Sequence, residues 1–468
     1  MVKDRIFTLQ QIIESENNFI RKYSQKKILS IAGEKIANYL YEYFSSKKIL
    51  FICGKGNNGM DGINAFGYLK SRKVKVEKFV INNSNKNNIC FEELNKKVSK
   101  NNLIIDCIFG TGLNRKIKGD FEKIIKLINI SKKKIISVDV PSGVNGNNGQ
   151  ISSCVVNASK TIVMGLNKPA YFLLPSKSFC GDLIFLDLGL KPPKDCSPKV
   201  SLIRKHLFVK KVPKFGINTN KYKKGHVLVI GGEMSGASRI AAISARKVGA
   251  GLSTIAVIKR YLKFYNSIDP GTILKEFNFN LLENKDVLII GPGLGRSVRK
   301  SEIIKIIKTF TRPIVIDADA ISIFKNHKVE FYNLLTKKKD IVVTPHEGEF
   351  KRVFNFPDKD KIKSSLKASE NINNTVLFKG NDTVVAFPDK EVFIDNNATQ
   401  TLASAGTGDM LCGLIAGFLA QKMDFKSAIQ TSLWINGKLS KIKKNVIIED
   451  FLSSIPTVLS LIKNNIAF

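Results

Sequence analysis

Short apolar runs, spaced along the whole chain and separated by helical patterns, are the feature that most constrains its fold. Continuous apolar runs of this kind are typical of parallel strands buried on both faces, which need helices to connect them. Each half of the chain therefore predicts an α/β fold with a mostly parallel sheet. The runs are residues 47–54, 74–81, 102–109, 134–140, 160–166 and 182–190 in the first half, and 225–232, 251–258, 285–293, 312–319, 339–346, 374–380 and 383–388 in the second, with 391–395 expected to pair antiparallel with the last.

Residues 191–200, KPPKDCSPKV, lack hydrophobic periodicity and are rich in proline and lysine. Such a segment is typical of a linker. It separates two sets of strands whose glycine motifs differ, and we find no internal repeat that relates them. We therefore expect the boundary within residues 191–215 and predict two domains, 1–200 and 201–468.

The net charge of +36 does not by itself indicate a nucleic-acid partner. The excess comes mainly from lysine, which is abundant along the whole chain together with asparagine and isoleucine. The sequence has no recognisable nucleic-acid-binding motif. We therefore expect small-molecule substrates and no nucleic acid.

Cysteine usage and the length of the apolar runs favour a cytoplasmic protein without a membrane span. The seven cysteines include no CxxC pair, which argues against a disulfide framework or a zinc site, and we expect small buried side chains instead. The longest apolar stretch, residues 410–420, is shorter than the roughly 20 residues that span a bilayer. The N-terminus has no apolar signal segment.

A glycine loop follows the first apolar run, in GKGNNGMDG at residues 54–62. Gly54, Gly56 and Gly59 allow a sharp turn and close approach to a ligand, and the helix that follows offers free N–H groups. Glycine loops are often only structural turns. The polar side chains of NNG and of Asp61 exceed what a turn needs and therefore indicate a site.

Polar residues also stand at the ends of two later strands of this half. Asp106 ends one apolar run and is followed by Thr111 between two glycines; Asp139 and Ser142 end the next run. Each aspartate alone could be a turn or cap residue. In open α/β sheets, ligands bind beyond the carboxyl ends of the strands, so three such ends predict one shared crevice.

These motifs, in the order IAGEKIA, GKGNNGMDG, DCIFGTGL and VDVPSG, resemble the N-terminal epimerase domain of the bifunctional NAD(P)H-hydrate repair enzymes over residues 8–190. The resemblance implies a Rossmann-like three-layer domain, a catalytic Asp139, and a potassium ion held by Asn58, Asp106 and Ser142. It implies that the hydrated cofactor contacts Asn57, Asn58, Gly59, Met60, Asp61, Gly110, Thr111, Gly112, Leu113, Asn114, Arg115, Lys116 and Asp139.

The chemistry that this resemblance implies needs a carboxylate. Epimerising the hydrated carbon requires its hydroxyl to leave and return through an iminium-like species, which a carboxylate beside it stabilises while shuttling a proton. Asp139 is the candidate. Lys55 and Met60 replace a proline and a glycine of the family pattern, and Met60 would be strained if its position required a positive φ. The alternative is a non-catalytic binding or assembly module.

The second half carries its own anion-binding motif, AGTGD at residues 405–409. Small residues before a helix expose backbone N–H groups to a phosphoryl group, and Asp409 could take the proton from an attacking hydroxyl. A helix N-cap is the alternative role for Asp409. Gly413 and Gly417, farther along the same helix, indicate close backbone packing or ligand approach.

AGTGD and the preceding motifs resemble the ribokinase-like NAD(P)H-hydrate dehydratase domain over residues 215–450. In order they are YKKGHVLVIGG, GPGLG, VIDADAI, TPHEGEF and FKGNDTVV. The resemblance implies that the hydrate contacts Ala250, Gly295, His346 and the catalytic Asp409, although a lone histidine is more often a buried or cap residue. It implies nucleotide contacts from Lys379, Gly380, Asn381, Asp382, Thr383 and Gly408.

The implied reaction turns a poor leaving group into a good one. Asp409 would deprotonate the hydrate hydroxyl as a nucleotide phosphoryl group is transferred to it, and phosphate would then leave. The resemblance implies ADP as co-substrate, Mg²⁺ that Asp317 and Asp319 help to position, and a homo-oligomer. The alternative is a ribokinase-like kinase for a vitamin precursor, which shares AGTGD but leaves the first half unexplained.

Overall fold

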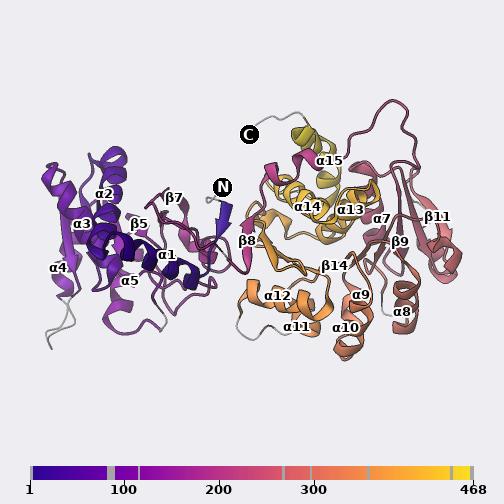
Figure 1. Ribbon diagram of the computed structural model, residues 1–468, viewed down its shortest axis with the longest axis horizontal. Helices are drawn as coiled ribbons and strands as arrows, with labels where there is room; N and C mark the ends of the chain where they lie inside the picture. Colours follow the sequence, from indigo (N-terminus) through magenta and orange to yellow (C-terminus); the bar gives the residue numbers. More distant parts are fainter. Residues whose placement is uncertain are drawn as a thin grey trace. The chain divides into compact units, whose positions relative to one another are not determined.

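The computed structural model describes residues 4–81, 90–113, 116–194, 196–265, 269–295, 298–354, 356, 359–442 and 446–463. The chain divides into two compact units, Met1–Lys199 and Val200–Phe468. Each unit is an α/β layered structure with its own sheet and its own apolar cores (Figure 1).

A parallel sheet forms the centre of the first unit, with the strand order β3-β2-β4-β5-β6-β7. Every apolar run predicted in this half is a strand. Cys53 at the end of β2 pairs with Cys107 of β4, and Asp106 with Ser137 of β5, so these three strands end at one level. The strands of this sheet are β2 (Ile49–Cys53), β3 (Val76–Val80), β4 (Leu103–Cys107), β5 (Lys134–Val138), β6 (Lys160–Met164) and β7 (Asp182–Leu186), whereas the short β1 (Arg5–Ile6) is not part of it.

Helices cover both faces of this sheet, as the alternation of strand side chains requires. Ile49, Phe51 and Cys53 pack toward α1, α2 and α3, whereas Leu50 and Ile52 pack toward α4 and α5. The three-layer arrangement predicted for this half is therefore present. The helices are α1 (Leu9–Lys22), α2 (Gln25–Phe44), α3 (Asn57–Ser71), α4 (Phe91–Lys100), α5 (Asp120–Ile130) and the short α6 (Lys177–Cys180).

The sheet of the second unit runs in the order β8-β17-β16-β15-β14-β13-β12-β9-β10-β11. It is parallel from β15 to β11, and β16 pairs antiparallel with β17, as predicted, and also with β15. No apolar run predicted the edge strand β11. The strands are β8 (Lys199–Leu202), β9 (His226–Gly231), β10 (Leu252–Val257), β11 (Ile273–Glu276), β12 (Val287–Ile290), β13 (Ile314–Ile316), β14 (Ile341–Val343), β15 (Thr375–Phe378), β16 (Val384–Ala386) and β17 (Glu391–Ile394).

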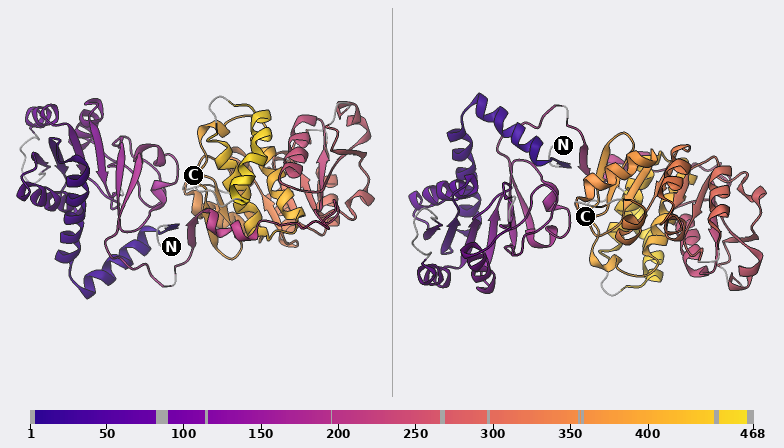
Figure 2. Two further views of the ribbon diagram at one scale, coloured as in Figure 1. Left: turned by 90° about the horizontal axis from the view of Figure 1, so that it is seen from above. Right: turned by 90° about the horizontal axis from the view of Figure 1, so that it is seen from below.

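Two helical layers enclose this second sheet. One contains α13 and stands nearest the viewer in the left panel of Figure 2, and the other contains α12 and stands nearest in the right panel. The first layer is α7 (Ser235–Lys247), α13 (Thr407–Ala420), α14 (Phe425–Leu439) and α15 (Ile448–Lys463); the second is α8 (Lys300–Thr309), α9 (Asp319–Ser322), α10 (Lys328–Thr336), α11 (Glu347–Val353) and α12 (Lys361–Ile372).

The cysteines and helices bear on two further expectations. All seven cysteines are free and most are buried, although Cys90 is exposed and Cys154 is partly exposed. Within the described ranges, we find no helix whose length and apolar character would suffice to cross a bilayer.

Close packing of α13 on α7 explains two glycines of the α13 motif. A Cβ atom at Gly413 would lie 2.2 Å from the carbonyl oxygen of Ala241, and one at Gly417 would lie 2.6 Å from that of Ala245. These contacts are with backbone atoms, which cannot shift without disturbing the hydrogen bonds of α7. Gly413 and Gly417 therefore serve helix packing, and this packing fixes where the first turn of α13 lies.

We predict that Gly413→Ala lowers the free energy of unfolding of the second unit by about 1–3 kcal/mol, the usual cost of overpacking. Gly236→Ala on α7 is the matched control, because a Cβ there meets nothing within 4 Å. Chemical denaturation of both variants measures the difference. Equal stability of the two variants would contradict the packing role.

Candidate functional site

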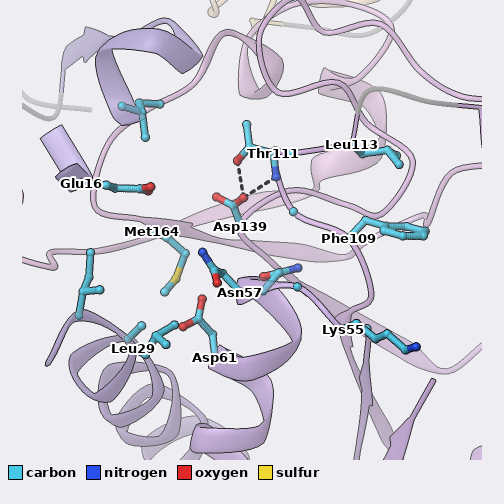
Figure 3. A pocket seen from close by; sticks show the side chains of 18 of the residues that line it. Glu16, Leu29, Lys55, Asn57, Asp61, Phe109, Thr111, Leu113, Asp139 and Met164 are labelled. Carbon is cyan, nitrogen blue, oxygen red and sulfur yellow. Dashed lines mark hydrogen bonds between the residues drawn. The ribbon is translucent and has the colours of Figure 1, made fainter. Parts of the chain in front are cut away.

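A cavity of about 680 Å³ lies at the carboxyl ends of β2, β4, β5 and β6 in the first unit (Figure 3). Three loops that the sequence singled out line it, those that begin at Gly54, Ile108 and Asp139. Helix α1 closes another side with Leu9, Ile12 and Glu16. The predicted convergence of three strand ends on one crevice is therefore what the structure shows.

Asp139 stands directly after β5 in a left-handed backbone conformation with φ of +69°, which is uncommon outside glycine. Hydrogen bonds hold this conformation: the Tyr171 hydroxyl donates to the Asp139 carbonyl at 2.6 Å, and the Asp139 N–H donates to Ile162 at 2.9 Å. Such strain at a strand end is typical of functional sites.

The carboxylate of Asp139 is held by a buried cation and a neighbouring threonine. Lys168, only 3% exposed, places its Nζ 2.5 Å from Oδ1. Thr111 donates both its N–H, at 2.8 Å, and its hydroxyl to Oδ2 (Figure 3). Burial alone would raise the pKa of Asp139, but Lys168 and then Thr111 outweigh it and hold the pKa below its usual value.

Asp61, on the first turns of α3, has the opposite electrostatic environment. It lines the cavity, and its Oδ1 is buried without a hydrogen-bond partner. Burial, followed by the charges of Asp139 and Glu16, raises the pKa of Asp61 to about 8. Burial also raises the pKa of Glu16, against the effect of Lys168. The cavity therefore holds one fixed carboxylate and a second carboxyl group that retains its proton near neutral pH.

The residues predicted to hold potassium differ in how free their oxygens are. Asn58 is buried, and neither its Oδ1 nor its Nδ2 has a partner, so this amide is available to a ligand. Asp106 accepts four hydrogen bonds, from the Ile108 N–H, the Ser137 hydroxyl, and both the N–H and hydroxyl of Ser142. These fill its acceptor capacity. Asn58 thus fits a cation, while Asp106 and Ser142 tie the strand ends together.

Other residues predicted to contact the hydrate divide into two groups. Asn57, Gly110, Gly112 and Leu113 line the cavity, and a Cβ at Gly110 would lie 2.8 Å from Oδ2 of Asp139. Gly59, Met60 and Lys116 do not line the cavity: a Cβ at Gly59 would lie 1.8 Å from the Gly54 carbonyl oxygen, Met60 is 41% exposed on α3, and Lys116 is exposed. Asn114 and Arg115 lie outside the described residues.

The two substitutions in the glycine loop leave its geometry intact. Met60 lies inside α3 and is absent from the described residues with positive φ, so it is not strained in the way the sequence suggested. Lys55 lies at the rim of the cavity, and its ammonium group points away from Asp139 (Figure 3). Sequence reasoning missed Lys168, which pairs with Asp139, and Glu16, which lines the cavity.

In the second unit, Asp409 is the third residue of α13, after Gly406 with φ of +88°. Gly406, not Asp409, is the N-cap, so the capping alternative for this carboxylate is wrong. Burial, then the charge of Asp317, raises the pKa of Asp409 to about 7 against the effect of Lys379. Asp409 is therefore suited to accept a proton near neutral pH.

A buried ion pair stands beside this helix start. Lys379, after β15, places Nζ 2.6 Å from Oδ1 of Asp317, after β13, and the Cys412 thiol donates to Oδ2 at 3.3 Å. Burial disfavours the ammonium form, but Asp317 outweighs it and raises the pKa of Lys379. A Cβ at Gly408 would lie 3.4 Å from this ammonium group. Lys379 thus faces the glycine loop as a permanent cation.

Gly295 and His346 are set by local hydrogen bonds. The Gly295 N–H, at φ of +76°, donates to Oδ2 of Asp319 at 2.9 Å. His346 caps α11: its Nδ1 accepts from the Gly348 N–H at 3.0 Å, and its Nε2 lies 3.3 Å from Oε1 of the buried Glu349. The cap interpretation of His346 is therefore confirmed, and its ring remains half exposed.

The KGNDT segment forms the turn between β15 and β16. The Thr383 hydroxyl donates to the Gly380 carbonyl at 2.7 Å, which closes the turn. Asp382 is bound at 2.6 Å by Lys361, which also donates to the Lys379 carbonyl at 3.2 Å. Lys361 is the first residue of α12 and is buried, and its two contacts stabilise the turn. Sequence reasoning missed this residue.

The structure does not bring Ala250 to this site. Ala250 precedes β10, at the amino ends of the strands, whereas Asp409 lies beyond their carboxyl ends. A Cβ at the adjacent Gly249 would lie 2.7 Å from the side chain of Gln421, which follows the last turn of α13. Gln421 lies twelve positions after Asp409, which is roughly 18 Å at the rise of an α-helix.

Metal binding by protein side chains alone has little support in either unit. Across the described ranges, we find no cluster of three or more histidine, cysteine or acidic side chains able to hold an ion. Asp317 is paired with Lys379, and Asp319 accepts from Gly295. A divalent ion at these two carboxylates would therefore need the phosphates of a nucleotide as its other ligands.

Comparison with known proteins follows the division of the chain. Residues 227–455 match the family model described as NAD(P)H-hydrate dehydratase, and residues 25–170 match that of the YjeF-related protein N-terminus. The chain is 29% identical to the bifunctional NAD(P)H-hydrate repair enzyme Nnr of Dictyoglomus turgidum over 94% of each chain. It is 27% identical to that of Coxiella burnetii, over 92% of this chain and 93% of the other.

A solved structure supports the fold of the second unit. A ribokinase-like superfamily protein of Enterococcus faecalis is similar to 58% of this chain and 99% of its own length, with a TM-score of 0.51 and 24% identity. This likeness confirms the ribokinase-like fold.

We predict that Lys379→Met destabilises the second unit by about 3–5 kcal/mol, because it leaves Asp317 buried without its partner. The double variant Lys379→Met with Asp317→Asn removes both charges and should recover part of this loss. Denaturant unfolding of the two variants and the wild type measures it. A double variant no more stable than the single one would contradict the ion-pair interpretation.

Proposed function

We propose that the chain belongs to the family of bifunctional NAD(P)H-hydrate repair enzymes and that each of its units carries out one step of that repair. The first unit interconverts the two epimers of hydrated NADH and NADPH. The second converts one epimer back to the reduced cofactor with a nucleotide as phosphoryl donor. The observation that carries the proposal is the helix start at Asp409, where a carboxyl group with a pKa near neutrality faces the glycine loop and Lys379.

The second unit supplies what a phosphoryl transfer to an alcohol requires. Asp409 removes the proton from the hydrate hydroxyl, whose oxygen then attacks the terminal phosphorus of ADP and releases AMP. The free N–H groups at the start of α13 and the ammonium of Lys379 neutralise the charge that develops on the phosphoryl oxygens. The ring nitrogen then expels phosphate, and loss of a ring proton restores the reduced nicotinamide.

The first unit supplies a fixed anion for a cationic intermediate. As the hydroxyl leaves the carbon beside the ring nitrogen, positive charge develops on the ring, and the carboxylate of Asp139 stabilises it. Lys168 and Thr111 hold that carboxylate in place. Asn57, Gly110, Gly112 and Leu113 line the cavity in which the nicotinamide half of the substrate would lie.

The proposal includes the ions, the nucleotide and the assembly implied by the resemblance. Potassium would bind at Asn58, whose amide has no partner, beside the network of Asp106 and Ser142. Asp317 or Asp319 would help to hold Mg²⁺, which would supply positive charge to neutralise the nucleotide phosphates. Lys379, Gly380, Asn381, Asp382, Thr383 and Gly408 would contact ADP. A cytoplasmic homo-oligomer without nucleic-acid partners completes the proposal.

We predict that the two active sites fail independently. The assay supplies mixed hydrate epimers with ADP or with ATP, and follows recovery of reduced-nicotinamide absorbance and, without nucleotide, interconversion of the epimers. Asp409→Asn should abolish recovery and keep interconversion, since the domains have separate sites. Asp139→Asn should abolish interconversion and keep recovery of the epimer that the second unit uses. Hydrate left untouched with both nucleotides would overturn the proposed function.

The pKa of Asp409 predicts the pH dependence of the second reaction. Asp409 acts as a base, so it must be ionised, and its pKa is raised to about 7. The rate of recovery at saturating ADP should therefore rise as the pH increases through about 7 and then level off. Initial rates across this range measure it, and a rate that is independent of pH there would exclude Asp409 as the base.

A further inference from the structure

We propose that Asp61, and not Asp139, is the carboxyl group that exchanges a proton with the hydrate hydroxyl in the first unit. In this division of roles, Lys168 is the positioning residue that keeps Asp139 as an anion. The inference rests on the proposed epimerase function and assigns its acid–base residue.

Asp139 has little capacity left for a proton. Three donors already point at its carboxylate, the ammonium of Lys168 and the N–H and hydroxyl of Thr111. A proton on Asp139 would have to displace one of these donors and would leave the buried ammonium of Lys168 without its anion. Lys168 is 3% exposed, and leaving such a cation unpaired is costly. The geometry therefore favours a permanent charge on Asp139.

Asp61 has the complementary geometry. Its carboxyl group points into the same cavity as Asp139 from α3, on the opposite side from Thr111 (Figure 3). Its Oδ1 is buried and has no hydrogen-bond partner, so a bound hydroxyl would be the first to satisfy it. An ionised Asp61 would be a buried charge beside two other acidic groups, which the neutral form avoids.

The groups around Asp61 are few and come from several elements. Among the described residues, the charged side chains that line the cavity are Glu16 from α1, Lys55 at the rim, and Asp139 after β5, with Lys168 behind Asp139. The thiols of Cys53 and Cys107 lie beneath α3 at Gly62. Burial and the acidic neighbours raise the pKa of Asp61 to about 8, so it holds its proton at neutral pH.

The step that follows is balanced. The C–O bond of the hydrate breaks as the ring nitrogen lone pair forms a C=N bond, and the departing oxygen takes the proton of Asp61 and leaves as water. Asp61 becomes a carboxylate and the ring an iminium cation beside Asp139. Water then adds to the other face of the same carbon and returns a proton to Asp61. No oxidant, reductant or further reactant is consumed.

Glu16 is a weaker candidate for the same role. Burial raises its pKa, but Lys168 opposes this effect, whereas no cation opposes the effect of burial on Asp61. Glu16 also comes from α1, which precedes the matched region 25–170, whereas Asp61 stands on the helix that follows the glycine loop. Glu16 adds to the negative surroundings that keep Asp61 protonated.

The test uses the full-length protein and one purified hydrate epimer without nucleotide. Asp61→Asn keeps the shape of the side chain and removes the acid. We expect kcat for epimer interconversion to fall by about 10²–10⁴-fold, the usual contribution of general acid–base catalysis, with KM little changed. Asp120→Asn at the start of α5, a half-exposed aspartate outside the cavity, is the matched control and should keep the wild-type rate.

Two pH profiles make the roles separable. Wild-type interconversion should fall as the pH rises through about 8, where Asp61 loses its proton. Lys168→Met removes the cation from Asp139, so that burial raises the pKa of Asp139 and activity is also lost as the pH falls, a limb that the wild type lacks. Lys168→Arg should restore the wild-type shape at low pH.

The outcomes distinguish a failure of the role assigned to Asp61 from a failure of the proposed epimerase function. Wild-type protein that fails to interconvert the epimers overturns the epimerase proposal itself. If the wild type is active, a near-normal kcat in Asp61→Asn overturns the inference alone. Should that variant fail to fold, as judged by thermal unfolding, the wild-type profile decides, because a rate that stays constant through pH 8 cannot depend on a protonated Asp61.

Discussion

A buried lysine paired with one of several carboxyl groups is the interaction on which both sites depend. In the first unit Lys168 pairs with Asp139 at 2.5 Å, and in the second Lys379 pairs with Asp317 at 2.6 Å. In each unit a second carboxyl group lies nearby without such a partner, and its pKa is raised, to about 8 for Asp61 and about 7 for Asp409. In each unit, the carboxyl group that is paired with lysine therefore keeps a fixed negative charge, and the unpaired carboxyl group can gain or lose a proton near neutral pH.

Backbone packing determines where these groups can stand. Gly59 lets the start of α3 approach the loop after β2, Gly54 lets that loop approach Ile108 after β4, and Gly413 and Gly417 let α13 pack against α7. In both cases the first turn of a helix is delivered to the carboxyl edge of a parallel sheet, where free N–H groups and strand-end carboxyl groups meet. The sheets differ in strand order and neighbours, so this likeness reflects a shared physical requirement.

The sequence predicted the elements far better than the pairing of side chains. Buried parallel strands must be apolar on both faces, so their runs were visible, whereas the edge strand β11, ILKE, carried no such pattern. Lys168 and Lys379 pair with partners 29 and 62 positions away, and nothing local marks one lysine among so many. The fold also places Ala250 at the amino ends of the strands, away from Asp409, and the sequence alone did not show on which edge of the sheet it lies.

Opposite requirements for the two unpaired acids set a common working range. Under the proposed roles, Asp61 has to keep its proton, which it does below about 8, and Asp409 has to lose its proton, which it does above about 7. A chain that must first exchange epimers and then consume one of them needs both conditions at once. The two burial environments, each balanced by one lysine, bring those conditions together near neutral pH, although neither acid would be in this pKa range if it were exposed.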